Sequence, residues 1–373
     1  TADAASKTYG ETDPELTATV TGLIGSDVVN YNVIRESGED AGTYVITTSG
    51  EEIQGNYKVT YKPGTFTINK ADMTVTTQGY DGTYDGQSHG GSVTPSVTEG
   101  TTIYYSTDGG QNWTTTPPTR TDAGETEVLV KVENDNYNTV NDKYTIKIDR
   151  ANVTVTANNA GKTYGKDDPV LTADVTGLFG SDTVEYVVTR EKGENVGTYD
   201  ITPTGETTQG NYTVTYEKGV FTISKSDELQ IFTTDYSGTY DGQTHGSAAT
   251  TNVSEGTKIT YSTDGGKTWS EDYPTITNVG TINVTVKAEN PNYETKTEEY
   301  TLEVKVKAVT VKADDVSKTY GDADPELTAT VDGLVGSDEI EYSVTRAEGE
   351  TVGTYAITAS GAAEQGNYTV TYV

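Results

Sequence analysis

Two sequence blocks alternate along this chain, and their repetition limits what it can fold into. The block that begins Lys7-Thr-Tyr-Gly returns at Lys162 and at Lys318, so equivalent positions lie 155 and 156 residues apart. A second block, Thr83-Tyr-Asp-Gly-Gln-Ser-His89, fills the interval and returns from Thr239 with an offset of 156. A period of this length is too long for one supersecondary unit, so each period must contain two folded modules.

The order of the blocks predicts five modules in the arrangement A-B-A-B-A. We place modules A1, B1, A2, B2 and A3 at residues 1–70, 71–150, 151–225, 226–307 and 308–373. Only A2 has both Ala151-Asn-Val-Thr-Val-Thr at its start and Gly219-Val-Phe-Thr-Ile-Ser at its end, so we expect A1 to lack its first strand and A3 its last. We interpret the chain as part of a longer protein, in which an A module without its last strand exposes a sheet edge that can exchange strands.

The residue pattern predicts an all-β chain. Thr, Val, Tyr and Ile dominate, and apolar residues alternate with Thr or Lys in segments such as Tyr212-Thr-Val-Thr-Tyr, whereas no stretch has the spacing of an amphipathic helix. Asp40-Ala-Gly-Thr-Tyr44 resembles the corner of immunoglobulin domains. We therefore expect small immunoglobulin-like β-sandwiches, with a β-grasp-like sheet as the alternative for module A. Alternation continues almost unbroken across the junctions without a Gly/Ser or Pro linker, which predicts an extended rod.

Composition excludes several classes of partner. The 57 acidic and 25 basic residues give a net charge of −32, which opposes binding to nucleic acid or to an anionic membrane surface. There is no cysteine, so redox regulation is excluded. No apolar run approaches membrane-spanning length, and we expect no membrane contact within these residues.

No set of residues predicts catalysis. The two histidines, His89 and His245, belong to different modules and cannot form a metal site or a dyad together. The segment Ser262 to Trp269 resembles the Asp-box of sialidases, and Ser106 to Trp113 matches it closely. In that motif Asp-Gly-Gly shapes a hairpin turn and performs no chemistry. We predict that the chain is not an enzyme and has no resident cofactor.

Three kinds of site remain as hypotheses. Calcium can bind acidic or amide-rich turns at Lys166-Asp-Asp-Pro169, Asp322-Ala-Asp324, Asn134-Asp-Asn136 and Asn290-Pro-Asn292, although none has a defined ligand spacing. Trp113 and Trp269 are candidates for glycan contacts. Internal isopeptide crosslinks would join a Lys of an early strand to an Asn of a late one, and the candidate pairs are Lys7 with Asn56, Lys162 with Asn211, and Lys318 with Asn367.

The A block resembles a known family. Lys-Thr-Tyr-Gly-x-x-Asp-Pro-x-Leu-Thr, together with the Gly-Thr-Tyr strand and the Gly-Asn-Tyr turns at 55–57, 210–212 and 366–368, is similar to the MBG domain of the YGX type. Module B, with Tyr84-Asp-Gly86 and Tyr240-Asp-Gly242, resembles the YDG-type and bacterial Ig-like repeats that accompany it. This resemblance implies a large, secreted bacterial cell-surface protein, an adhesin in which the modules form the stalk.

We therefore predict a structural stalk that projects a binding head, located outside these residues, toward a host or matrix glycan or protein. Two alternatives stay open. The modules themselves can bind mucin or glycan, or the chain can act as the protomer of a surface filament. We expect a monomer in solution, with end-to-end strand exchange as the route to a filament.

Overall fold

The computed structural model describes all 373 residues, and every regular element in it is a β-strand. The prediction of an all-β chain of tandem modules is confirmed. None of the A modules contains the helix that a β-grasp sheet would carry, and the structure has no helix suited to crossing a membrane. The contacts divide the chain into two compact units. Unit 1 consists of Thr1–Asn158, Thr172–Thr189 and Thr202–Lys218, and unit 2 consists of Asn159–Leu171, Arg190–Ile201 and Gly219–Val373.

Module A1 in unit 1 is built around one four-stranded sheet. Its strand order is β1 (Ala5–Thr8), β6 (Gly64–Asn69), β3 (Gly42–Ser49) and β2 (Asn32–Arg35), with β1 parallel to β6. A separate hairpin pairs β4 (Ile53–Gln54) with β5 (Tyr57–Lys58). Ile46, Phe66 and Ile68 are buried in this sheet because alternate residues of β3 and β6 face the core.

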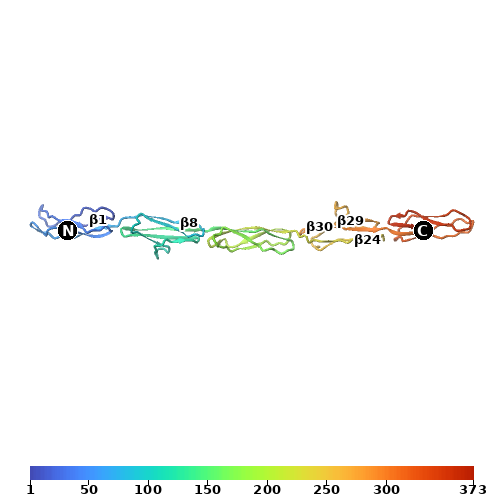
Figure 1. Cartoon of the computed structure of the whole chain (residues 1–373), viewed down its shortest axis with the longest axis horizontal. Coiled ribbons are helices and arrows are strands. Elements are labelled where there is room, and N and C mark those ends of the chain that lie inside the picture. The colour runs from blue at the N-terminus through green and yellow to red at the C-terminus, as the bar shows by residue number, and fades with distance from the viewer. The chain divides into compact units, whose positions relative to one another are not determined.

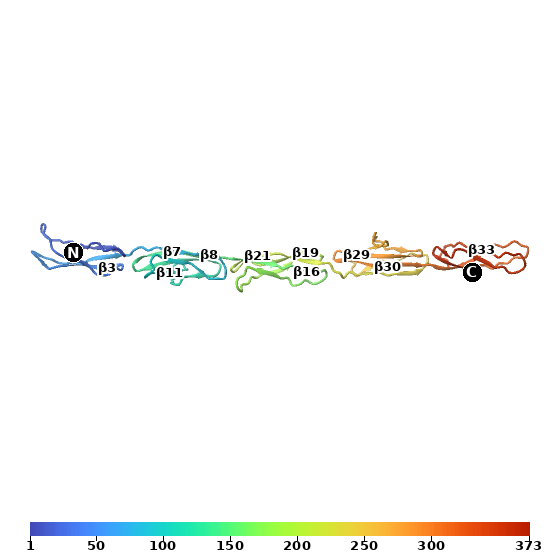
Figure 2. The same ribbon diagram turned by 45° about the horizontal axis from the view of Figure 1, so that its top comes forward.

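Module B1 in unit 1 is a small sandwich, with β7, β8 and β11 labelled in Figure 2. One sheet has the order β11 (Thr102–Ser106), β13 (Gly124–Asn134), β14 (Tyr137–Asp149) and β8 (Tyr80–Thr83). Two short pairs complete the module: β10 (Ser92–Pro95) with β7 (Val75–Gln78), and β12 (Thr119–Arg120) with β9 (His89–Gly90). Alternate residues of β13 are fully buried, and Val75 and Val93 of the first pair pack against them.

The strands of module A2 are divided between the two units. Unit 1 contains β17 (Ala173–Thr176), β15 (Ala151–Ala157), β21 (Tyr212–Glu217) and β20 (Thr208–Gln209), in that order. The sheet of β16 (Ala160–Thr163), β22 (Gly219–Ser224), β19 (Gly197–Thr204) and β18 (Val187–Arg190) has its β16–β22 pair and the Gly197–Ile201 part of β19 in unit 2. Its β16–β22–β19 pairing reproduces β1–β6–β3 of module A1.

Unit 2 also holds modules B2 and A3. The main sheet of B2, in which β24, β29 and β30 are labelled in Figure 1, has the order β24 (Tyr236–Thr239), β30 (Tyr293–Lys305), β29 (Gly280–Asn290) and β27 (Lys258–Ser262). Its short pairs are β23 (Ile231–Phe232) with β26 (Thr250–Thr251) and β25 (His245–Gly246) with β28 (Thr275–Ile276). Module A3 has the sheet β32 (Ala329–Asp332), β31 (Lys307–Ala313), β36 (Tyr368–Tyr372) and β35 (Glu364–Gln365), and the pair β33 (Ser343–Arg346) with β34 (Ile357–Ser360).

Candidate functional site

One asparagine occupies the same place at all four joints between modules. Its side-chain Oδ1 accepts a hydrogen bond from a backbone N–H of the preceding module, over 2.7–2.9 Å, and its Nδ2 donates to an Asp or Asn Oδ1 in the same loop, over 3.0–3.2 Å. Because both ends of the amide are used, each contact fixes the orientation of the loop as well as its distance. We call these residues the joint asparagines: Asn136 (bonded to Asp40 and Ala41), Asn211 (Asp122 and Ala123), Asn292 (Asn195 and Val196) and Asn367 (Asn278 and Val279).

The main chain of each joint asparagine hydrogen-bonds the segment by which the chain enters the asparagine's own module. Its carbonyl oxygen accepts, over 3.0 Å in each case, from a backbone N–H where the chain enters that module: Ala71, Ala151, Ser226 and Lys307, the last residue before A3. The side chain therefore reaches back to one module while the backbone anchors the other. All four joint asparagines are half-buried, which strengthens these bonds by limiting competition from water.

The B-to-A joints add a buried pair of tyrosines. At the B1–A2 joint, Tyr84 and Tyr212 meet edge to face with ring centroids 5.4 Å apart, and both hydroxyls donate to Oδ2 of Asp182, over 2.9 and 2.7 Å. Burial and the bond to Asp182 raise the pKa of Tyr212 to about 12. The folded joint therefore favours the protonated form of the Tyr212 phenol.

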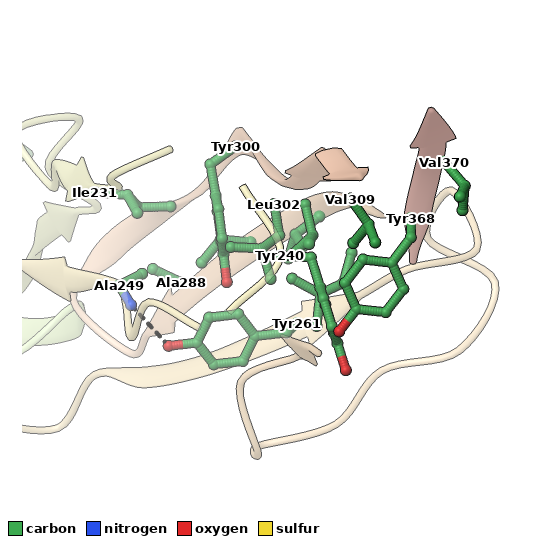
Figure 3. Close-up of a cluster of buried hydrophobic side chains, with 14 of the residues drawn as sticks. Ile231, Tyr240, Ala249, Tyr261, Ala288, Tyr300, Leu302, Val309, Tyr368 and Val370 are labelled. Carbon is green, nitrogen blue, oxygen red and sulfur yellow. Dashed lines mark hydrogen bonds between the residues drawn. The ribbon is translucent and has the colours of Figure 1, made fainter. Parts of the chain in front are cut away.

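The B2–A3 joint repeats this arrangement. Tyr240 and Tyr368 lie 5.5 Å apart and share Oδ2 of Asp338, over 2.9 and 2.6 Å. Figure 3 shows the two rings together with Leu302 of B2 and Val309 of A3 in one group of buried side chains. The hydrophobic core is therefore continuous from B2 into A3, as it also is from Ile148 into Ala151 and Val153 at the B1–A2 joint.

Strand alternation shifts by one residue inside each B-to-A joint. Strand β14 buries Ile146 and Ile148, β15 buries Ala151 and Val153, and Arg150 alone separates the two strands. Val306 has the same place between β30 and β31 and is 48% exposed. Because a one-residue shift exchanges the two faces of a strand, a single linking residue reorients the buried face from one module to the next.

The A-to-B joints have a longer connection and a less buried aromatic pair. Residues 70–74 separate β6 from β7, and residues 225–230 separate β22 from β23. Tyr9 packs on Tyr137 with centroids 5.4 Å apart, and Tyr164 on Tyr293 at 5.3 Å, but all four rings are half-buried. No buried cluster links A1 with B1.

Each A module contains an ion-pair network whose residues are close in sequence to those that form the A-to-B joint. In A1, Asp13 pairs with Lys7 over 2.7 Å and with Arg35 over 2.5 Å, and Glu39 pairs with the same two cations. The pKa of Asp13 is lowered to about 2, first by Arg35 and then by Lys7. The network recurs as Lys162, Asp168, Arg190 and Glu194 in A2 and as Lys318, Asp324, Arg346 and Glu350 in A3.

The repeated Lys-Thr-Tyr-Gly block thus connects two features. Lys7 belongs to the network, and two residues later Tyr9 reaches module B1. On the other side, Glu39 of the network precedes Asp40, which receives the bond from Asn136. Tyr44 supports this loop, since its hydroxyl donates to the Asp40 carbonyl over 2.8 Å in the manner of an immunoglobulin tyrosine corner.

The Asp-box segments form the turns expected of them. Asp108 Oδ1 accepts from the backbone of Gln111 and Asn112, and Gly109 and Gly110 have φ of 73° and 89°. Trp113 donates its indole N–H to the Gly110 carbonyl, and Lys131 lies over its ring at 5.4 Å. Trp269 is placed alike, with Lys287 at 4.7 Å. A cation on each ring occupies a surface that a sugar would need, and glycan contact at these residues stays a prediction.

The histidines are turn residues of module B. His89 stacks on Tyr80 with centroids 4.0 Å apart and bonds Asp85, and His245 stacks on Tyr236 at 4.1 Å and bonds Asp241. No group of three or more His, Cys, Asp or Glu side chains in the 373 residues is placed to hold a metal ion.

The turns proposed for calcium have other partners in the structure. Asp168 and Asp324 belong to the ion-pair networks, and Asn136 and Asn292 are joint asparagines. Asn134 and Asn290 each donate to a carbonyl oxygen in their own B module, that of Glu99 or Glu255.

The residues proposed for crosslinks also have separate partners. Lys318, beyond the end of β31, pairs with Asp324 and Glu350, whereas Asn367 bonds Lys307 at the start of β31. Lys7 and Lys162 belong to the networks, Asn211 is a joint asparagine, and Asn56 is exposed. The structure does not bring Lys318 and Asn367 together. An intact mass lower by one ammonia per bond would be needed to support the crosslinks.

Sequence reasoning missed the joint contacts although it had singled out their parts. The Gly-Asn-Tyr turn, the Asn-Asp-Asn turn and the Asp-Ala-Gly loop were each interpreted within one module. The signal that would have found the contacts is their spacing, because joint asparagines and loop partners lie 88–97 residues apart at every joint.

Solved structures similar to the chain are tandem repeats of β modules. Human desmocollin-1 ectodomain is 11% identical with a TM-score of 0.24, covering 88% of this chain and 85% of that one. Domains EC1–4 of Drosophila N-cadherin are 11% identical with a TM-score of 0.23, covering 81% and 98%. Titin domains I67–I69 are 10% identical with a TM-score of 0.27, covering 63% and 99%. Likeness at this level is no evidence of a shared function, and no curated protein matches the chain.

A family model does match. The MBG domain (YGX type) matches residues 1–67, 153–222 and 309–373, which together make up more than half of the chain. These segments contain the ion-pair networks, the Lys-Thr-Tyr-Gly blocks and two of the joint asparagines. The chain belongs to the MBG domain (YGX type) family.

Proposed function

We propose that this chain is a mechanical spacer, a segment of the stalk of a bacterial cell-surface adhesin. The observation that carries the proposal is the joint asparagine, which is present with the same bonds at all four joints. A chain of independent modules on flexible linkers needs no such contact, whereas a spacer that transmits force requires the orientation of each module to be fixed by its neighbour.

Two further features support this role. The net charge of −32 keeps such a surface protein soluble and disfavours nucleic acid as a partner. The absence of cysteine is compatible with a stalk whose modules are stabilised by packing and hydrogen bonds. We propose an extracellular location at the bacterial surface, with a binding head elsewhere in the protein that takes a host or matrix glycan or protein.

The test replaces the joint asparagines and measures flexibility. We expect Asn136→Ala, Asn211→Ala, Asn292→Ala and Asn367→Ala combined to lower the maximum dimension and broaden the distance distribution in small-angle X-ray scattering. The matched control is Asn56→Ala, since Asn56 has the same place in a Gly-Asn-Tyr turn but is exposed. Identical scattering from the fourfold variant and the wild type would contradict the proposal.

A further inference from the structure

The segment by which the chain enters a B module lies alongside the strand by which it leaves. In B1, β8 pairs in parallel with the last part of β14, from Tyr80 with Ile146 to Thr83 with Asp149. In B2, β24 pairs in the same way with β30, again over four residue pairs. A parallel ladder between the entering and the leaving strand therefore connects the two ends of each B module.

Backbone bonds extend this pairing in B1 beyond the four residue pairs. Where the chain enters the module, the Ala71 N–H donates to the Asn136 carbonyl over 3.0 Å. Where it leaves, the Asp149 carbonyl accepts from the Tyr84 N–H over 2.8 Å. The side chains of Asn136 and Tyr84 bond the neighbouring modules, so the bonds at both ends of the ladder involve joint residues.

Between these ends the entering segment stays close to the leaving strand, although β7 pairs with β10. In B1, a Cβ at Gly79 would overlap the Thr145 carbonyl oxygen of β14, so a side chain there would force the two segments apart. In B2, Asp235 has the place of Gly79, and its carboxylate accepts from the Thr301 N–H over 2.7 Å. Two different residues thus maintain the same approach.

Module A2 has the same relation in both of its sheets. Strand β15 pairs in parallel with β21, and β16 pairs in parallel with β22, and in both ladders the partners are 61 residues apart. The first ladder belongs to unit 1 and the second to unit 2. We call these pairings the entry–exit ladders: β8–β14 in B1, β15–β21 and β16–β22 in A2, and β24–β30 in B2.

Tension on the chain acts on such a ladder along its strands. It pulls the entering strand toward one end of the module and the leaving strand toward the other, so the two parallel strands must slide past each other. The evenly spaced hydrogen bonds of a parallel pair then share the load and must break together. The same ladder pulled apart from one end would lose its bonds one after another.

We propose that the entry–exit ladders are the force-bearing elements of these modules, and that tension along the chain loads them in shear. The proposal rests on the proposed stalk function for the source of the tension, and it adds which strands carry the load. The short pairs β9–β12 and β25–β28 lie outside the load path, because neither contains an entering or a leaving strand.

Force spectroscopy on the full 373-residue chain tests the loading direction in B1. The chain has no cysteine, so two introduced cysteines define the points of attachment. Asp72→Cys with Asp149→Cys pulls along the ladder, whereas Asp81→Cys with Asp149→Cys pulls it apart from one end, and all three side chains are exposed. We expect a rupture force at least about twofold higher in the first geometry at equal pulling speed, because forced unfolding depends on the barrier and not on the free energy of unfolding.

Module B2 repeats the comparison in unit 2, where a poorly folded B1 variant has no influence on the result. Asp227→Cys with Lys305→Cys pulls along the ladder of B2, and Ser237→Cys with Lys305→Cys pulls it apart from one end. The same order of rupture forces is expected.

A matched pair of glycine substitutions tests the ladder itself. Gly79→Ala pushes the entering segment away from β14 and should lower the rupture force measured along the ladder. Gly109→Ala strains a turn residue with φ of 73° but adds no contact, and it should leave that force unchanged.

Equal rupture forces in the two geometries, or equal losses from the two glycine variants, would overturn the proposal. The stalk function is judged separately, because scattering by the joint-asparagine variants reports the orientation of modules and not their resistance to force. Stiff joints combined with equal rupture forces would support the spacer and contradict the force-bearing ladders.

Discussion

The two kinds of joint share the asparagine contact but differ in what surrounds it. At the B-to-A joints one residue links two strands, a buried tyrosine pair shares one carboxylate, and the hydrophobic core runs through. At the A-to-B joint between A1 and B1 the connection is longer, the aromatic pair is half-buried, and the cores are separate. A B module and the A module that follows it should therefore unfold together, while an A-to-B joint should be the place that bends first.

The largest effect is expected from a comparison of one tyrosine substitution at each kind of joint. Tyr212→Ala should destabilise the B1–A2 joint by about 3 kcal/mol, because it opens a cavity and leaves Asp182 with one partner fewer. Tyr137→Ala should cost about 1 kcal/mol, since that ring is half-buried.

The measurement is native-state hydrogen exchange, because the unfolding of a five-module chain need not be two-state. After Tyr212→Ala, protection should fall both in β14 and in β15. After Tyr137→Ala, it should fall near Ala71 and leave β3 and β6 unchanged. Equal losses in the two variants would remove the distinction between the joints.

Much of this organisation was readable from the sequence. Alternation along strands, the period of the blocks, the Asp-box turns and the Asp-x-Gly-x-Tyr corner all depend on neighbours close in the chain, and the structure shows each of them. Local patterns predict such features because backbone geometry and turn chemistry decide them.

The joints were not readable in this way, since they depend on side chains from different modules. The bonds of Asn211 to Ala123 and Asp122 cross 88 and 89 residues, and nothing local distinguishes Asn211 from a turn asparagine. The shift in alternation at Val306 was hidden for a related reason. An exposed valine in a run of valines looks like the continuation of a buried face.

Alkaline pH should weaken the B-to-A joints, together with the cores of the B modules, where burial also raises the pKa of Tyr144 and Tyr300 to about 12. Burial raises the pKa of Tyr212 from 10.0 to about 12, and that of Tyr368 likewise. A phenol whose pKa is higher in the folded state stabilises the fold fully below pH 10, and this stabilisation is lost as pH rises from 10 to 12. Hydrogen exchange or tyrosine absorbance between pH 9 and 12 should show β15 and β31 losing protection before β3. Tyr212→Phe, which does not titrate, should reduce the change at β15, and an unchanged profile would argue against the joint as its cause.

Acid should weaken the ion-pair networks of the A modules, near the A-to-B joints. We expect this effect to be the smallest, because the carboxylates of the networks are exposed and partly screened by solvent. The pKa of Asp13, Asp168 and Asp324 is lowered to about 2, first by the arginine and then by the lysine of each network. A carboxyl group whose pKa is lower in the folded state stabilises the fold above its unfolded pKa of about 4, and the stabilisation is lost as pH falls to about 2. The Glu39 loop contacts module B1 through Asp40, so acid should loosen the A-to-B joint. Hydrogen exchange of β1 and β6, measured over the range from pH 4 to pH 2, should show the onset of this loss shifted by Asp13→Asn. Asp27→Asn, at a carboxylate outside the network, should leave the onset unchanged. If β14 and β15 separated at a higher pH than A1 and B1, the order of strength assigned to the two joints would be reversed.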